Sequence, residues 1–212
     1  MKRYYHIIYI VIVTLTVALM PLFSRGKVFN VVEPEPEPLL AEGEYIISPY
    51  DQVFRRVCRR HGVDWLLMSA IAYSESRFRA DVVSPRGAVG IMQVMPHIAN
   101  HWDVTAEELR DPAINIDVAC RLYKSMQKQL RIPKTVDELD CIAFTVASYN
   151  CGASRVIDAR NLTEYYENSK DDWTMVRDYM LLLTEEEFYN HEAVVAGRFR
   201  EPHITIAYTN KV

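Results

Sequence analysis

The pattern of hydrophobic and polar residues changes twice along the chain. An uncharged hydrophobic run occupies residues 7–23, and a stretch rich in proline and glutamate follows it. From residue 45 onward, hydrophobic residues recur with the spacing of amphipathic helices, interrupted by Pro, Gly, Asn and Asp. This pattern predicts a mainly α-helical domain over residues 45–212. The helices are expected at 49–61, 63–79, 91–102, 105–110, 114–131, 136–148, 152–159 and 172–183, with short strands left open at 82–89 and at the β-prone segment 203–209.

The first 44 residues predict an attachment to a membrane. Residues 1–24 are interpreted as an N-terminal membrane anchor or uncleaved signal, because the hydrophobic run approaches the ~20 residues that a spanning helix needs and no clear small-residue cleavage site follows it. Lys2 and Arg3 place the N-terminus in the cytoplasm and the remaining chain outside the membrane. Residues 25–44 form a Pro/Glu-rich linker, which in an extended conformation could reach roughly 60 Å.

Composition narrows the function further. Half of the residues are hydrophobic, which suffices for the core of one domain. The net charge of −4 and the absence of a basic cluster argue against nucleic acid as a partner. Cys58 and His61 are three residues apart, but no second pair has matching spacing, so no metal site is expected. The four cysteines include no C-x-x-C pair, and their pairing into disulfides stays open.

Glu75 is the first candidate for chemistry. On the predicted helix over 63–79 it shares one face with Ile71 and Phe78, so a carboxylate interrupts an apolar stripe. Removing a carboxylate from water raises its pKa, which would let Glu75 hold a proton near neutral pH and act as a general acid. The alternative is an exposed Glu75 that forms an ion pair with Arg79.

Three motifs downstream of Glu75 are typical of a known protein family. They read SPRGAVGIMQVMP over 84–96, DPAINI over 111–116 and ASYNCG over 147–152. Together with Glu75-Ser76 they resemble lytic transglycosylases of the soluble-lytic-transglycosylase type, which are relatives of goose-type lysozyme. The family pattern is a Glu-Ser pair, Ser-x-x-Gly-Ala-x-Gly-Leu-Met-Gln-x-Met-Pro, Asp-Pro-x-x-Asn-Ile and Ala-Tyr-Asn-x-Gly. The resemblance covers roughly residues 48–208.

The resemblance implies a lysozyme-like (goose-type) α-helical domain with a glycan-binding groove. It identifies Glu75 as both catalytic acid and base in cleavage of the MurNAc-GlcNAc β-1,4 bond of peptidoglycan, with formation of 1,6-anhydro-MurNAc. The substrate's own acetamido group and C6 hydroxyl take the roles of a second carboxylate and of water, so a single glutamate suffices. No cofactor and no metal are implied.

Five further residues in these motifs are candidate substrate contacts. Ser84 and Gln93 offer neutral hydrogen-bonding groups for sugar hydroxyls and N-acetyl groups, and Met92 could line the groove floor. Tyr149 and Asn150 would meet Glu75 or the N-acetylmuramic acid from the opposite wall. Structural roles are the alternative for three of them: Met92 could fill the core, Ser84 could cap a turn, and Asn150 could cap the following helix.

The C-terminal region resembles a narrower group. Residues 188–200 are similar to the tail of membrane-bound lytic transglycosylases of the F type, in which a Thr-x-x-Tyr pattern follows. Here Thr205 and Tyr208 supply it after one extra residue, so Tyr208 is a further candidate groove residue. Cys151 departs from the family pattern, and its thiol could pair with Cys141 on the preceding helix or act as a nucleophile, although no His-plus-carboxylate arrangement accompanies it.

The expected location and partners follow from these features. We expect a protein on the periplasmic face of the bacterial inner membrane, anchored at its N-terminus or exported, with peptidoglycan glycan strands as substrate and cell-envelope proteins as candidate partners. Two other functions stay open: a non-catalytic peptidoglycan-binding scaffold, and a lysozyme-like hydrolase of the same bond. The sequence does not separate wall turnover from a dedicated role in a secretion apparatus.

Overall fold

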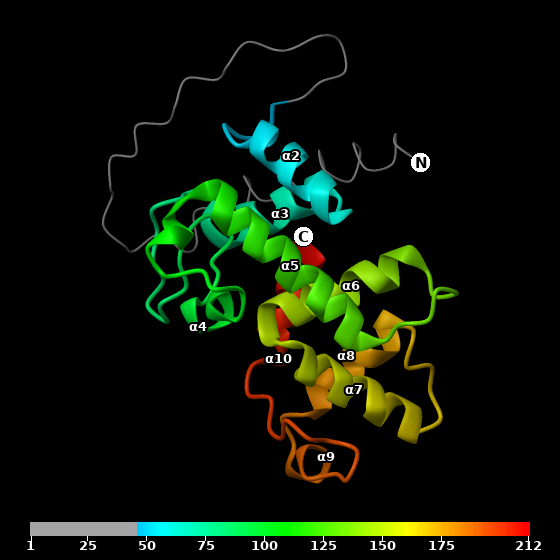
Figure 1. The fold of residues 1–212 in the computed structure, drawn as a ribbon. Helices are drawn as coiled ribbons and strands as arrows, with labels where there is room; N and C mark the ends of the chain where they lie inside the picture. The colour runs from blue at the N-terminus through cyan, green and yellow to red at the C-terminus, as the bar shows by residue number, and fades with distance from the viewer. Residues whose placement is uncertain (1–45) are drawn as a thin grey trace, which may run out of the picture. The chain divides into compact units, whose positions relative to one another are not determined.

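The computed structural model describes residues 46–212, and every regular element in this range is a helix (Figure 1). Residues 50–210 and Val212 form one compact unit, to which the following account refers. The predicted mainly α class is therefore confirmed. The elements are α2 (Asp51–His61), α3 (Trp65–Ser76), α4 (Pro96–Ala99), the 3-10 helices η2 (Asn100–Trp102) and η3 (Glu108–Arg110), α5 (Pro112–Leu130), α6 (Glu138–Cys151), α7 (Ala153–Tyr165), α8 (Trp173–Leu182), α9 (Glu186–Tyr189) and α10 (Pro202–Lys211).

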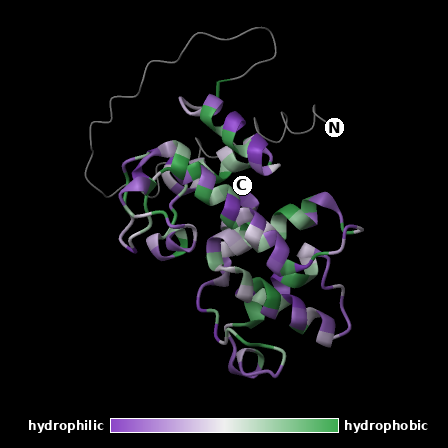
Figure 2. Cartoon of the chain, viewed as in Figure 1, coloured by the Kyte–Doolittle hydropathy of each residue, from purple (hydrophilic) through white to green (hydrophobic). Residues whose placement is uncertain are grey.

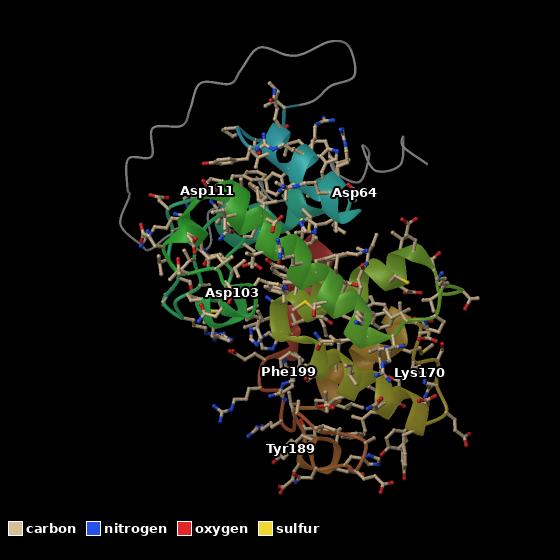
Figure 3. All side chains as sticks on the ribbon, in the orientation of Figure 1. Asp64, Asp103, Asp111, Lys170, Tyr189 and Phe199 are labelled. Carbon is tan, nitrogen blue, oxygen red and sulfur yellow. The ribbon has the colours of Figure 1, made fainter. Side chains whose placement is uncertain are left out.

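Aspartate side chains fix the start of four helices. Figure 3 labels two of them, Asp64 and Asp111. Asp64 accepts a hydrogen bond from the backbone N–H of the second residue of α3, and Asp111 accepts two at the start of α5. Asp137 and Asp172 do the same for α6 and α8. Each cap satisfies backbone donors that the helix itself leaves unpaired, which typically contributes about 1 kcal/mol. These local signals explain why most of the predicted helices form where the sequence indicates.

Two hydrophobic clusters make up the core, and most helices carry both hydrophobic and hydrophilic residues (Figure 2). The first core joins α2, α3, α5 and the segment over 89–94. The second core joins α6, α7 and α8. The first core contains Phe54, Val57, Met68, Ile71, Met92 and Ile116, and the second contains Phe144, Val156, Leu162, Trp173, Val176 and Met180.

The helix α5 connects the two cores. It has 19 residues, which corresponds to a length of about 28 Å. It packs against α2 in the first core and against α6 and α7 further along the chain, while α7 and α8 lie side by side (Figure 1). Elements that are distant in sequence are thereby held at fixed positions around α5.

One predicted helix starts later than expected, and one segment left open as a strand is helical. The helix expected over 91–102 begins only at Pro96, because Ile91–Gln93 form a turn and Val94 pairs with Val89 in an isolated antiparallel bridge. The segment over 203–209 is not a strand but part of α10, which Pro202 starts at its first position. At 82–89 the structure contains only an isolated bridge between Val83 and Val89.

The proposed pairing of Cys141 with Cys151 is also wrong. Both residues lie on the same helix, α6, ten positions apart, which separates them by about 15 Å along the axis. A disulfide requires Cα atoms within about 7 Å. All four cysteines are free thiols in the structure.

The predicted membrane anchor over 1–24 and the linker over 25–44 lie outside the described residues. Between residues 46 and 212, none of the helices combines the length and the apolar character needed to cross a membrane.

Candidate active site

Glu75 lies near the C-terminal end of α3 and is half-buried. The hydroxyl of Tyr208 donates a hydrogen bond of 2.6 Å to Oε1 of Glu75, although the two residues are 133 positions apart in sequence. Tyr208 belongs to α10, so the last helix of the chain supplies a direct partner to the candidate acid. The alternative of an exposed Glu75 is therefore wrong, because the side chain is half-buried.

The residue after Glu75 fastens the end of α3 to the neighbouring loop. Ser76 is buried, and its hydroxyl donates a 2.7 Å hydrogen bond to the backbone carbonyl of Ile91. The chain then leaves the helix through Arg77 and Phe78, which both adopt left-handed backbone conformations with φ of 55° and 60°. Two consecutive non-glycine residues in this region are costly, at about 1–3 kcal/mol each, and persist only where surrounding contacts hold them. The contacts around Glu75 therefore hold the backbone at the end of α3 in one conformation.

The loop over 90–93 faces this helix end and depends on Gly90. Gly90 has φ of +81°, and a Cβ atom there would lie 2.4 Å from Nδ2 of Asn115 and 2.6 Å from the carbonyl oxygen of Leu109. Both the backbone conformation and the available space therefore require glycine. This explains the second glycine of the Gly-Ala-x-Gly pattern in physical terms.

Asn115 organises the same loop from α5. It is fully buried, and its Nδ2 donates to the carbonyl oxygens of Val89 at 2.9 Å and Leu109 at 2.8 Å. Its Oδ1 accepts from the backbone N–H of Met92 at 2.8 Å. One side chain thus satisfies three buried backbone groups, which would be expensive to leave unpaired. The motif over 111–116 therefore acts by shaping the loop beside Glu75.

Tyr149 approaches the loop from α6. Its hydroxyl donates a 2.9 Å hydrogen bond to the backbone carbonyl of Met92. Burial raises the pKa of Tyr149 well above its usual value, and the negative charge of Glu75 raises it further. The same two causes, together with its hydrogen bond to Glu75, raise the pKa of Tyr208. Both phenols are consequently neutral at physiological pH and act as hydrogen-bond donors beside a carboxylate.

The motif residues Ser84 and Gln93 make local contacts. The hydroxyl of Ser84 accepts a 3.0 Å hydrogen bond from the backbone N–H of Ala88 and so closes the turn that leads to the loop. Gln93 has φ of +50°, and its Nε2 donates to the carbonyl oxygen of Gly90 at 2.9 Å and to that of Val82 at 3.3 Å. Ser84 therefore caps a turn, as one of the two interpretations of the sequence holds, and Gln93 stiffens the loop over 90–93.

Met92 and Asn150 also have defined structural contacts. The side chain of Met92 is fully buried in the first core, and its backbone is the part that meets Asn115 and Tyr149. Asn150 is exposed, and its Oδ1 accepts a 2.7 Å hydrogen bond from the hydroxyl of Thr205 on α10. Asn150 thereby links the end of α6 to the helix that carries Tyr208.

Residues on α7 hold the segment that leads into α10. Asp158 is buried, and its two carboxylate oxygens accept from the backbone N–H groups of Val195 at 2.9 Å and Ala196 at 2.8 Å. Arg155 donates to the carbonyl oxygen of Gly197, and Asn161 donates to that of Ala193 at 3.2 Å. The position of Tyr208 therefore rests on α6 and α7 as well as on its own helix.

Three residues that support the site, Asn115, Thr205 and Asp158, were assigned no role from the sequence. Asn115 stood in a quoted motif, but its buried position is visible only once α5 packs beside the loop. Thr205 belonged to the Thr-x-x-Tyr pattern, and no signal singled out Asp158.

Neither a reactive thiol at Cys151 nor a metal centre is supported by the described residues. Burial raises the pKa of Cys151 to about 12, so the thiol is protonated at neutral pH and poorly suited to act as a nucleophile. In the part of the chain that the structure describes, no group of three or more His, Cys, Asp or Glu side chains is arranged to hold a metal ion.

Comparisons of the sequence with a family model and with curated proteins both match transglycosylases. Residues 52–173 match the family model of the transglycosylase SLT domain, a range that includes Glu75 and all the proposed contacts except Tyr208. The chain is 31% identical over 157 residues to a membrane-bound lytic murein transglycosylase F of Marinobacter nauticus, which corresponds to 74% of this chain and 30% of the relative. It is 32% identical over 128 residues to a protein of the same name from Haemophilus influenzae, covering 60% of this chain and 26% of that one. The chain thus spans about 30% of the length of the curated relatives it matches.

A solved structure supports the fold. The chain is similar to the 70 kDa soluble lytic transglycosylase of Escherichia coli, with a TM-score of 0.53, 22% identity, and coverage of 76% of this chain and 22% of that one. The predicted lysozyme-like α-helical fold class is thereby confirmed.

Proposed function

Because this chain belongs to the family defined by the transglycosylase SLT domain, we propose that it cleaves the MurNAc-GlcNAc β-1,4 bond of peptidoglycan as a lytic transglycosylase. The observation that carries the proposal is the hydrogen bond of 2.6 Å between Tyr208 and Glu75, on a helix end fastened by Ser76. It orients a half-buried carboxyl group beside two neutral phenols, Tyr149 and Tyr208. Such an arrangement suits acid–base work on a neutral sugar.

In the proposed mechanism Glu75 acts twice. Protonated Glu75 donates its proton to the glycosidic oxygen while the C1–O bond breaks, and the acetamido group of MurNAc stabilises the cationic centre. Ionised Glu75 then accepts the proton of the C6 hydroxyl, whose oxygen forms a bond to C1. The product is 1,6-anhydro-MurNAc, and proximity of the internal nucleophile makes a second carboxylate and an attacking water unnecessary.

The tyrosines support this double role. Tyr208 donates to Oε1 and so holds the carboxyl group in one orientation while its charge changes. Tyr149 stays protonated, and its hydrogen bond to the carbonyl of Met92 keeps the loop over 90–93 in place beside Glu75. We assign positioning rather than proton transfer to both phenols, since their raised pKa values make them poor proton donors at neutral pH.

Substrate contacts are proposed for the surface next to Glu75. Gln93 lies on the loop that Ser76 binds at the end of α3, and the charge of Glu75 acts on Tyr149. Both side chains carry groups that can bond to sugar hydroxyls and N-acetyl groups. Ser84, Met92 and Asn150 would contribute mainly by holding the walls of the proposed groove, in keeping with their contacts to Ala88, to the first core and to Thr205.

We also propose that the domain over 45–212 acts on the periplasmic side of the inner membrane. The uncharged run over 7–23 and the linker over 25–44 support this location, and the curated relatives carry the description membrane-bound. Cell-envelope proteins are candidate partners on the same grounds.

The products of purified sacculi test the proposal. Digestion with the full chain followed by mass spectrometry is expected to yield muropeptides that are lighter by one water than their reducing-end counterparts. Reducing-end products would instead identify a lysozyme-like hydrolase. Binding of sacculi without release of any soluble fragment would identify a non-catalytic scaffold.

A further inference from the structure

Two cysteines outside the candidate active site lie in direct contact. Cys58 on α2 and Cys120 on α5 are 62 positions apart in sequence, and their sulfur atoms are 3.7 Å apart. Both side chains are fully buried in the first core, where α2 packs along α5. At this separation the two sulfurs touch, so no other group lies between them.

We propose that Cys58 and Cys120 form a disulfide bond between α2 and α5 when the chain folds in an oxidising medium. The reaction is thiol–disulfide exchange with a small-molecule or protein disulfide. One cysteine thiolate attacks a sulfur of the oxidant and releases one oxidant thiol, and the second cysteine thiolate then attacks the mixed disulfide and releases the other. The protein loses two protons and two electrons, and the oxidant disulfide is reduced to two thiols.

The geometry makes this pairing selective. Cys141 and Cys151 are excluded as partners of each other by their separation along α6. The sulfur of Cys141 lies near the carbonyl of Val136, and that of Cys151 near the carbonyl of Gly152. Cys58 and Cys120 are therefore the pair whose sulfur atoms the fold brings into contact.

Burial determines when the bond can form. In the folded chain neither sulfur is accessible to solvent. The hydrogen bond with Cys58 and burial both raise the pKa of Cys120, so its reactive thiolate form is scarce. Oxidation is therefore expected during folding or during local opening of α2, and it should be slow in the intact native protein.

The bond would strengthen the support of the active-site helix. α2 packs against α3, and Phe54 of α2 contacts Phe78 edge-to-face just beyond Glu75. α5 carries Asn115, which holds the loop over 90–93. A covalent link closing a loop of about 60 residues is expected to raise Tm on the order of 10 °C for a chain of this size.

Oxidative refolding of the full chain tests the proposal. The protein is unfolded and reduced, refolded with reduced and oxidised glutathione, treated with an alkylating reagent under denaturing conditions and analysed by intact mass and peptide mapping. We expect two alkylated cysteines, Cys141 and Cys151, and a cross-linked peptide pair that contains Cys58 and Cys120. Four alkylated cysteines, or a cross-link involving Cys141 or Cys151, would overturn the proposal.

Cysteine variants distinguish the effect of the Cys58–Cys120 bond from other effects of oxidation on the protein. Cys58→Ala and Cys120→Ala should each abolish the cross-link and the Tm difference between oxidised and reduced protein, while the double variant Cys141→Ser/Cys151→Ser keeps both. Should an alanine variant fail to fold, the wild type itself gives the answer through its Tm with and without a reductant. An equal Tm in both states, with the cross-link present, would refute the stabilising role. Neither readout depends on the proposed enzymatic activity.

Discussion

Removal of a single hydroxyl group tests how the structure orients Glu75. Tyr208→Phe keeps the aromatic ring, which packs against the first core, and deletes only the 2.6 Å hydrogen bond to Oε1 of Glu75. A hydrogen bond to a charged group contributes about 1.5–3 kcal/mol. If this energy holds the carboxyl group in its reactive orientation, kcat should fall about 10- to 150-fold, because each 1.4 kcal/mol corresponds to a factor of ten.

The assay is the initial rate of soluble muropeptide release from purified sacculi at several substrate concentrations. The loss should appear in kcat with little change in KM, since Tyr208 acts on the acid rather than on ground-state binding. Tyr179→Phe is the matched control: its hydroxyl accepts a hydrogen bond from Asn168 in an exposed position, so the variant should retain wild-type kinetics. A Tyr208→Phe variant with an unchanged kcat would refute the reasoning.

Further predictions concern the loop over 90–93 and the charged group formed by Asp117, His61 and Arg121. Gly90→Ala should lower the free energy of unfolding by more than about 2 kcal/mol in urea titrations, because the new methyl group would lie 2.4 Å from Nδ2 of Asn115 at a φ of +81°; an unchanged midpoint would contradict this. Asn115→Ala should cost at least about 3 kcal/mol and reduce activity, because three buried backbone groups lose their partner; full stability would show that the loop is held otherwise. Burial raises the pKa of Asp117, but hydrogen bonds from His61 and Arg121 outweigh it and lower the pKa below 3.8. Because the pKa of Asp117 is lower in the folded than in the unfolded chain, its charge stabilises the fold at pH values above the unfolded pKa, and this stabilisation is lost as the pH falls through the folded pKa. The wild type should therefore lose more stability than Asp117→Asn between about pH 4 and pH 2. Parallel plots of stability against pH for the two proteins would refute this prediction.

The helices could be predicted from the sequence because their signals are local. Asp64, Asp111, Asp137 and Asp172 sit next to the amide groups that they cap, and the spacing of apolar residues within each helix does not depend on the rest of the fold. The partial burial of Glu75 could likewise be predicted, because this residue interrupts an apolar helix face.

Other features depend on contacts between distant segments. The helix expected over 91–102 starts only at Pro96 because Asn115 and Ser76 bind the backbone of residues 91 and 92 in a turn. Residues 203–209 contain the β-prone Ile204, Thr205 and Ile206, yet they form a helix with Pro202 at its first position. β-propensity depends on context, and no strand lies beside this segment among the described residues.

The sequence motifs named the candidate site residues, but they did not indicate how these residues are arranged. The motifs indicated Glu75 and Tyr149, whereas the hydrogen bond between Glu75 and Tyr208 joins positions 133 apart and cannot be derived from spacing. The contact between Cys58 and Cys120 was missed for the same reason. Sequence periodicity indicates which face of a helix is buried, but it does not indicate which residue of another helix it meets.

The most direct test of the central claim is the activity of Glu75→Gln on purified sacculi. Glutamine keeps the size of the side chain and an acceptor for Tyr208, but it cannot exchange a proton with the sugar. Glu107→Gln is the matched control, because the side chain of Glu107 is 86% exposed and forms an ion pair with Arg110 at the surface. We predict that Glu75→Gln lowers the rate of muropeptide release at least about 100-fold while its Tm stays close to that of the wild type. A Glu75→Gln variant that releases fragments as fast as Glu107→Gln would contradict the account.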